Sequence, residues 1–429
     1  MTRLFAAFLA LALLAPQANA AGMMGPMSDY KPGNLKLGNV SINPWYSVST
    51  AYDSNIFAVP VDQVTGVRQG GGVRSAWVTT NMLGVNFKLP VSAMHSFDGG
   101  ADVTHVNFSK QPRTNDYTAW GARLGYNYTG PMGIFGRIYD GYTNTADPAF
   151  SELAGARSQR WANSLGGSLG YAPDGGRLVL GGSADHTVDK YVDGQTFGPL
   201  LNRYTQTFGA NVGYRVQPKT KVFVGYRRQI IHYTVKRTAS EDKNSKSHFA
   251  DLGVEGVIAP KLRGLIQAGY QLRDYDQASD AIVGTRSARR SYVQAVVASS
   301  QLTWKPMDRC VWILALNRGL NESTFVTNRY SITNNANISV THRFPYKLTA
   351  NVRGGVSIDK YPESVSPTPG VAAHNRRDDT YTQGVGLSYG IREWVSIGAD
   401  YQHSQRHSTA SGQFNYEQHL TTLNAKLTF

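Results

Sequence analysis

The chain has 429 residues, a formal net charge of +14 and one cysteine. A single cysteine excludes a disulfide framework, and no apolar run after residue 20 is long enough for a transmembrane helix. The mean hydropathy of −0.33 fits a soluble protein, but it also fits a β-barrel, in which only every second residue contacts lipid.

The first twenty residues have the features of a secretory signal peptide. Arg3 supplies the positive charge, Leu4 to Leu14 form the apolar stretch, and Ala18-Asn19-Ala20 is a cleavage motif. We therefore predict a signal peptide at 1–20 and a short periplasmic segment at 21–40. An exported chain meets little nucleic acid, so the positive charge favours lipopolysaccharide or an anionic solute as the partner, and no nucleic acid.

From residue 41 onward, apolar and polar residues alternate with a period of two. In the segment 347–360, Leu348, Val352 and Ile358 fall on one face, whereas Asn351 and Arg353 fall on the other. This period predicts β-strands, because a helix would require a period of 3.6. The polar face is rich in small and hydroxylic residues, which suits a water-filled lumen.

Short turns and longer polar connections alternate along the chain. Seven of eight short turns contain proline, as in Gly130-Pro131 and Lys305-Pro306, and proline cannot donate to a strand ladder. The alternation is typical of a transmembrane barrel with short periplasmic turns and longer outer loops.

We therefore predict an all-β chain whose single domain, 41–429, is an antiparallel transmembrane β-barrel in the cell outer membrane. The expected strand count is about 18, within a range of about 16–18. The two longest loops, 56–72 and 361–377, are candidates for inward constrictions. The expected strands are 41–55, 73–89, 95–109, 117–129, 132–146, 159–172, 177–193, 203–216, 220–236, 247–259, 262–278, 289–305, 310–324, 330–344, 347–360, 378–391, 394–409 and 414–429.

The last expected strand ends on an aromatic residue. Phe429 shares a face with Leu423, Ala425 and Leu427. Such an ending resembles the closing strand of bacterial outer-membrane barrels. The resemblance implies that Phe429 is an assembly signal and that the barrel assembly machinery is a partner, so we expect deletion of Phe429 to impair assembly.

Eight arginines fall on the polar face of their strands, together with acids such as Asp98, Asp251 and Asp400. Rings of arginine favour anionic solutes, whereas arginines paired with lumenal acids would only stabilise the wall. The sequence leaves both interpretations open. The candidates for lumenal selectivity are Arg123, Arg137, Arg215, Arg227, Arg263, Arg273, Arg343 and Arg353.

The first strand ends in a sequence that resembles a family motif. Tyr52-Asp53-Ser54-Asn55-Ile56-Phe57 is similar to the N-terminal Tyr-Asp-x-Asn-Ile-Phe motif of the putative β-barrel porin type 2 family. The resemblance implies a Gram-negative outer-membrane pore, linked to capsule or exopolysaccharide export, with a polysaccharide solute and a periplasmic export partner. In a second interpretation, the side chains of Asp53 and Asn55 shape the exit from strand to loop.

The sequence contains no recognisable catalytic or metal-binding pattern. Asp185 and His186 are adjacent on a strand and point to opposite faces. Cys310 has no partner, and His403 and His407 have helical spacing within an expected strand. We expect no enzyme activity, no cofactor and no metal. The predicted function is a channel, and the alternative is a structural or adhesive surface barrel with an occluded lumen and binding loops.

Overall fold

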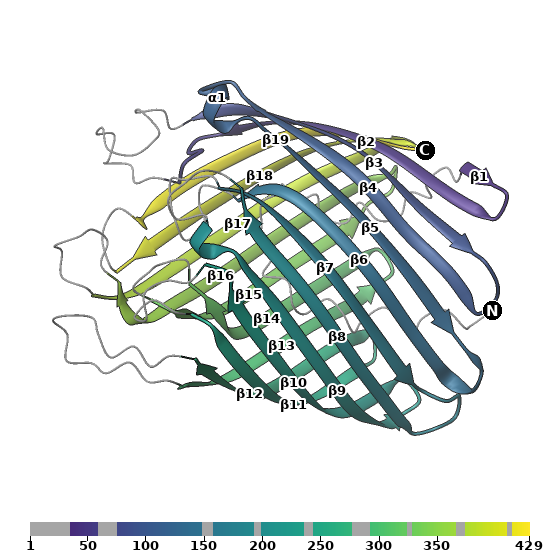
Figure 1. The fold of residues 1–429 in the computed structure, drawn as a ribbon. Helices are drawn as coiled ribbons and strands as arrows, with labels where there is room; N and C mark the ends of the chain where they lie inside the picture. The colour runs from purple at the N-terminus through teal and green to yellow at the C-terminus, as the bar shows by residue number, and fades with distance from the viewer. Residues whose placement is uncertain are drawn as a thin grey trace.

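The computed structural model of the protein describes residues 35–58, 75–147, 158–192, 199–235, 243–276, 292–323, 328–365, 374–409 and 414–429. These residues form one antiparallel sheet that closes into a barrel (Figure 1). The predicted signal peptide at 1–20 and residues 21–34 of the predicted periplasmic segment lie outside the described residues.

Eighteen long strands form the wall, and each is antiparallel to its neighbours. The first and last of them also pair, with Thr428 opposite Trp45 and Leu420 opposite Asp53. The prediction of an antiparallel barrel with 18 strands is therefore confirmed. The wall strands are β2 (Val40–Asp53), β3 (Ala76–Pro90), β4 (His95–Phe108), β5 (Tyr117–Thr129), β6 (Ile134–Asp147), β7 (Ser158–Tyr171), β8 (Leu178–Tyr191), β9 (Arg203–Gln217), β10 (Thr220–Tyr233), β11 (Ser245–Ala259), β12 (Leu262–Tyr275), β13 (Tyr292–Met307), β14 (Cys310–Glu322), β15 (Tyr330–Arg343), β16 (Leu348–Val365), β17 (His374–Arg392), β18 (Val395–Ser408) and β19 (Tyr416–Thr428).

A short extra strand, β1 (Leu35–Leu37), forms a hairpin with the start of β2, with Leu37 opposite Val40. Gly38 in the connecting turn has a φ of 60°, a left-handed conformation that two-residue hairpin turns need and that glycine adopts without strain. This strand was not predicted from the sequence, because three residues are too few to show an alternating pattern.

The two ends of the barrel differ in the length of the connections between strands. At one end, which we call the turn end, the connections have two to six residues, and β19 finishes there at Thr428. At the other, the loop end, they have 7 to 22 residues, and β2 finishes there at Asp53. The described connections also contain three short helices: α1 (Pro112–Asn115), η1 (Pro131–Gly133) and η2 (Pro199–Leu201). Among the described residues, no helix has the length and apolar character needed to cross a bilayer.

One expected loop is shorter than its sequence indicated. Residues 361–365 continue β16, and residues 374–377 begin β17, with Tyr361 opposite Arg376. The Arg376 guanidinium lies 4.8 Å from the centre of the Tyr361 ring and pairs with Asp378. These contacts extend the ladder into a segment whose prolines and polar residues favoured a loop.

The alternation of side chains divides the wall into an outer apolar face and an inner polar face. Leu83, Leu252 and Leu423 each expose 62% of their surface on the outside, as a lipid-facing surface would. The barrel has no central apolar core among the described residues. The described buried hydrophobic cluster instead lies at the loop end and consists of Ile56, Phe57, Ala76, Val106 and Phe108.

Candidate functional site

The candidate site is the lumen, which holds a cavity of about 2640 Å³. All eighteen wall strands contribute residues to its lining. The lining extends from Tyr191 and Tyr361 near the loop end to Asp308 and Glu393 at the turn end. The polar face predicted from the alternation therefore surrounds a continuous space along the barrel.

The charges that line this cavity are balanced. Among the described lining residues, Arg and Lys number twelve, and Asp and Glu also number twelve. The net charge of +14 of the whole chain is therefore not concentrated in the described part of the lumen. Balanced lumenal charge gives weak preference between small anions and cations, because selectivity arises from an excess of one sign.

Four of the eight predicted arginines form ion pairs with acidic side chains. The shortest nitrogen–oxygen distances are 3.1 Å for Arg137–Asp98, 3.6 Å for Arg227–Asp251 and 2.5 Å for Arg353–Asp400. The fourth pair joins Arg273 to Glu322, with the Arg273 side chain only 2% exposed. These four arginines therefore pair with acidic residues of the barrel wall, which is one of the two interpretations that the sequence left open.

The other four predicted arginines have different surroundings. Arg215 donates to the carbonyl oxygens of Pro173 and Gly176, both at 2.6 Å, and so holds a turn. Arg123 donates to Asn86 Oδ1 at 2.5 Å and lines a separate cavity of about 360 Å³. Arg263 and Arg343 line the main cavity. Within the described part of the chain, the Arg263 guanidinium has no hydrogen-bond or ion-pair partner.

Glycines allow lumenal side chains to meet across an intervening strand. Arg353 on β16 reaches Asp400 on β18 by crossing β17, where Gly384 and Gly386 lie opposite them. A Cβ on Gly384 would lie 2.8 Å from the Arg353 guanidinium carbon, and one on Gly386 would lie 2.6 Å from an Asp400 oxygen. The sequence indicated the arginine, but not the glycines that make its contact possible.

Uncharged amide and hydroxyl groups follow β14, β15 and β16 on the lumenal face, between charged residues such as Arg343 and Arg353. Asn337 donates to Asn335 Oδ1 at 2.6 Å, and Asn351 donates to Thr341 at 2.9 Å. All four residues, with Asn317, line the main cavity. These amide and hydroxyl groups offer a series of uncharged hydrogen-bond donors and acceptors.

The outer part of the β14–β15 hairpin leans into the lumen. Pairing of β13 with β14 stops at Ala298 opposite Arg318, although β13 continues to Tyr292 against β12. Beyond this point, Glu322 on β14 accepts a 2.9 Å hydrogen bond from Tyr233 on β10 and pairs with Arg273 on β12. The hairpin therefore crosses over β11 to β13 and narrows the loop end.

Buried contacts hold this hairpin in place. Lys243 donates to the carbonyl oxygen of Ser323 at 2.7 Å, and the Arg329 guanidinium lies 4.2 Å from the centre of the Tyr275 ring. Ser323 is 1% exposed and Arg329 is 3% exposed. Sequence reasoning proposed constrictions in loops 56–72 and 361–377, of which residues 59–72 and 366–373 lie outside the described residues. It missed the β14–β15 hairpin, since apolar residues such as Leu316 blur the alternation before it.

The motif at the end of β2 joins the first wall strand to the last. Gln418 on β19 donates to both carboxylate oxygens of Asp53 at 2.9 Å. Asn55 donates its backbone N–H to Asp53 at 2.8 Å and its side-chain amide to the Glu417 carbonyl at 2.9 Å. Ile56 and Phe57 pack in the buried cluster, whereas Tyr52 faces outward and contacts Trp77 edge-on. Asp53 and Asn55 thus shape the strand exit.

Phe429 also joins β19 to β2, at the turn end of this junction between the first and last wall strands, which we call the seam. Its backbone N–H donates to the Pro44 carbonyl at 2.9 Å, and its ring stacks on Trp394 with centroids 6.1 Å apart. The residue is 43% exposed and lies on the outward face that it shares with Leu423 and Leu427. The seam between β19 and β2 is therefore held at both ends by residues that the sequence singled out.

One comparison with known protein families agrees with this architecture. A family model described as putative beta-barrel porin 2 matches residues 28–429. A search of curated proteins found no match.

Several solved structures resemble the barrel at low sequence identity. The FrpB iron transporter (F3-3 variant) of Neisseria meningitidis is 11% identical, with 85% of this chain and 62% of FrpB covered and a TM-score of 0.46. The outer membrane protein OpdK of Pseudomonas aeruginosa is 11% identical, with coverages of 90% and 99% and a TM-score of 0.46. A single-substitution mutant of the ferric enterobactin receptor PfeA of Pseudomonas aeruginosa is 10% identical, with coverages of 90% and 80% and a TM-score of 0.47.

Proposed function

Because the chain belongs to the putative beta-barrel porin 2 family, a family of porin-like outer-membrane barrels, we propose that it is a channel for a hydrophilic, hydroxyl-rich solute such as a polysaccharide chain. The observation that carries this proposal is the polar cavity of about 2640 Å³ to which all eighteen wall strands contribute. A barrel of this size has room for an aqueous channel when nothing fills it.

The chemistry of the lining supports an uncharged, hydrogen-bonding solute. Acidic and basic side chains balance among the described lining residues, and Asn317, Asn335, Asn337 and Asn351 follow one wall. Amide groups both donate to and accept from hydroxyl groups, so they can exchange hydrogen bonds with successive sugar units as the solute moves. An anionic saccharide also fits this proposal, since Arg263 faces the cavity without a partner in the described part of the chain.

The same proposal includes an orientation of the barrel in the membrane and its neighbouring molecules. The outward apolar band lies in the outer membrane of a Gram-negative cell, with lipid and lipopolysaccharide as its neighbours. The turn end faces the periplasm, where the signal peptide directs the chain, the assembly machinery reads Phe429, and an export partner delivers the solute. The loop end faces outward.

A second candidate function is a surface barrel with an occluded lumen and binding loops. The observation that favours it is the packed loop end, where Glu322 and Arg329 contact β10 and β12, and Ser323 accepts from Lys243 just before β11. If this packing closes the lumen permanently, solutes do not pass and the barrel presents only its outer surface.

Flux through proteoliposomes tests the channel and its solute together. We expect neutral oligosaccharides to enter liposomes that contain the folded protein. The double variant Asn335→Leu, Asn337→Leu removes lumenal amides and should slow sugar entry more than it reduces ion conductance. Ala336→Leu is the matched control, because Ala336 lies between the two asparagines and points to the opposite face. Absence of any sugar flux through folded protein would support the occluded barrel. If the double variant and Ala336→Leu affect sugar entry equally, the amides of Asn335 and Asn337 do not contribute to passage of the sugar.

A further inference from the structure

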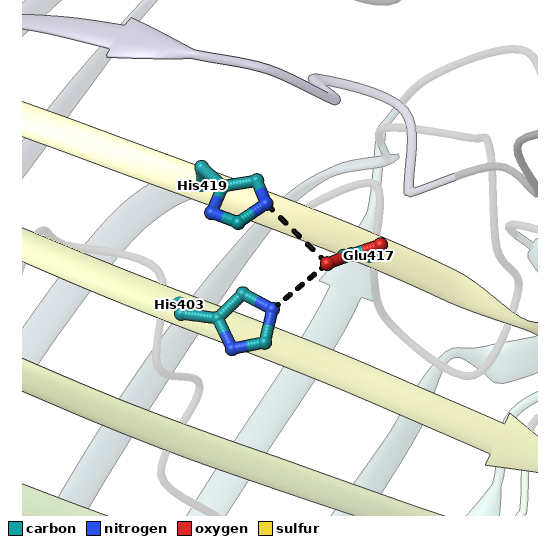
Figure 2. A group of neighbouring side chains, drawn as sticks. All are labelled: His403, Glu417 and His419. Carbon is teal, nitrogen blue, oxygen red and sulfur yellow. Dashed lines mark hydrogen bonds and ion pairs between the residues drawn. The ribbon is translucent and has the colours of Figure 1, made fainter.

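Two histidines and a glutamate meet on the outer surface of the barrel. His403 on β18 lies opposite His419 on β19, and Glu417 precedes His419 by two residues. Neighbouring residues Gln402 and Gln418 line the lumen, so these three side chains point away from it. Figure 2 shows both imidazole rings directed at the Glu417 carboxylate.

The spacing of the three groups matches that of metal ligands. The Nε2 atoms of His403 and His419 lie 3.2 Å and 3.4 Å from the same carboxylate oxygen of Glu417. In a tetrahedral zinc site with bonds of about 2.0–2.1 Å, ligand atoms are about 3.3–3.4 Å apart. One potential ligand atom from each residue lies within 4.8 Å of the others, and no other such group of three exists among the described residues.

Neighbouring side chains hold both imidazoles in a ligating orientation. The Tyr401 hydroxyl lies 2.8 Å from His419 Nδ1, and the Gln383 amide lies 3.2 Å from His403 Nδ1. Metal-binding histidines usually use one ring nitrogen for the metal and the other for such a hydrogen bond. A half-turn of the Gln383 amide lets its oxygen accept from Nδ1–H, which leaves Nε2 free to bind a metal.

The cluster is accessible and lies close to the expected membrane surface. The side chains of Glu417 and His419 are 45% and 47% exposed. Thr421, two residues further along β19, lies opposite the outward aromatic residues Tyr52 and Tyr401, and aromatic residues of this kind mark the membrane interface. The cluster is displaced from this level toward the loop end, where an ion can enter from water.

We propose that His403, Glu417 and His419 form a binding site for a divalent transition-metal ion, with Zn²⁺ as the ion that two imidazoles and a carboxylate fit best. Solvent completes the coordination. The bound ion links β18 to β19, the strand that closes the barrel. Sequence reasoning missed this site because it compared His403 with His407 on the same strand, whereas the register brings His403 to His419.

Calorimetric titration with Zn²⁺ tests the proposal on the full-length, tag-free protein in detergent micelles after treatment with a chelator. We expect one saturable equivalent, and at least tenfold weaker binding after His403→Gln, Glu417→Gln or His419→Gln. His248→Gln is the matched control, since His248 also bonds a tyrosine hydroxyl, that of Tyr226 at 2.6 Å, but belongs to no such cluster in the described chain. This control should bind like the wild type.

Two further measurements separate a lost site from a lost fold. Each variant should keep the mobility difference between unheated and heated samples in gel electrophoresis, which reports a folded barrel. Titration with Co²⁺ should give the intense visible absorption of a tetrahedral site with nitrogen ligands in the wild type and not in His403→Gln. Absence of saturable Zn²⁺ binding by the folded wild type, or undiminished binding by the double variant His403→Gln, His419→Gln, would overturn the proposal.

Discussion

Several hydrogen-bonded pairs in the barrel wall reach over a strand that lies between their own two strands. Tyr139 on β6 donates to Asp185 on β8 over Gly166 of β7. Arg137 bonds Asp98 in the same way over Gly125, where an added Cβ would lie 2.9 Å from the guanidinium. The absence of a side chain on the middle strand is therefore a requirement of each contact.

The substitution Gly384→Ala tests this requirement. Its Cβ would displace the Arg353 guanidinium from Asp400, and weakening a charge-assisted hydrogen bond costs about 1.5–3 kcal/mol. Alanine otherwise favours a strand over glycine by about 0.5–1 kcal/mol, so a net destabilisation of about 1 kcal/mol is expected in denaturant unfolding. Gly225→Ala is the control, because its Cβ would meet nothing closer than 3.8 Å. It should be neutral or stabilising, and equal stability of the two variants would contradict this role of Gly384.

The seam between β2 and β19 differs from other strand pairs because the two strands are far apart in the sequence. Asp53, Asn55 and Gln418 join them at the loop end, and Phe429 joins them to Pro44 at the turn end. Every other neighbouring pair of wall strands is connected by a turn or loop. The seam therefore depends on these side-chain and terminal contacts more than on local chain connectivity.

The substitution Asp53→Ala should weaken the seam. It leaves the amide of Gln418 without its carboxylate acceptor. Because Gln418 is only 8% exposed, the loss of this acceptor costs about 1–3 kcal/mol. The expected result is a lower midpoint temperature for conversion of the folded to the unfolded gel band. Asp140→Ala serves as the control, because Asp140 accepts one exposed hydrogen bond from Asn163 away from the seam. If the midpoint temperature falls no further than in this control, the contact between Asp53 and Gln418 does not stabilise the seam.

The inward lean of the β14–β15 hairpin depends on the pair between Glu322 and Arg273. Removing one partner of a buried ion pair costs about 3–5 kcal/mol, because the other charge stays buried and unpaired. Glu322→Ala should therefore release the hairpin from β10 and β12 and raise the single-channel conductance. Glu393→Ala removes a lining carboxylate at the turn end and should leave the constriction intact. Equal conductance changes in the two variants would show that the hairpin does not narrow the channel.

The strands were predictable because alternation with period two is a local property of the sequence. All eighteen, including 289–305 and 310–324, where the alternation is weakest, appear close to their expected positions. The lean of β14 was not predictable, because it arises from contacts between Glu322 and residues 49 and 89 positions away. The pairing of His403 with His419 likewise depends on the register between two strands, which the alternation of each strand alone does not determine.

The excess positive charge of the protein does not lie in the described part of the lumen. Sequence reasoning identified lumenal arginines from their position in each strand, but it could not assign their partners, since these lie on other strands. Arg137, Arg273 and Arg353 pair with acids two strands away, and Arg227 pairs with an acid on the adjacent strand. The described lining carries equal numbers of basic and acidic residues. A channel with this lining should discriminate little between small anions and cations.

Reversal potentials in a salt gradient test this electrostatic interpretation. The wild type should give a ratio of chloride to potassium permeability close to one. Arg263→Gln removes a cation that has no partner in the described chain and should shift the ratio toward potassium. Arg353→Gln leaves Asp400 unpaired and should shift it in the same direction, but with a loss of stability that Arg263→Gln lacks. A strong anion preference in the wild type would contradict the balance of charge.

Whether the lumen conducts can be measured by single-channel recording. Purified protein, shown to be folded by its heat-dependent mobility, is added to a planar lipid bilayer, and the current is recorded at fixed voltage. The channel interpretation predicts discrete, uniform current steps from the wild type. A bilayer that stays silent although folded protein has inserted would contradict it.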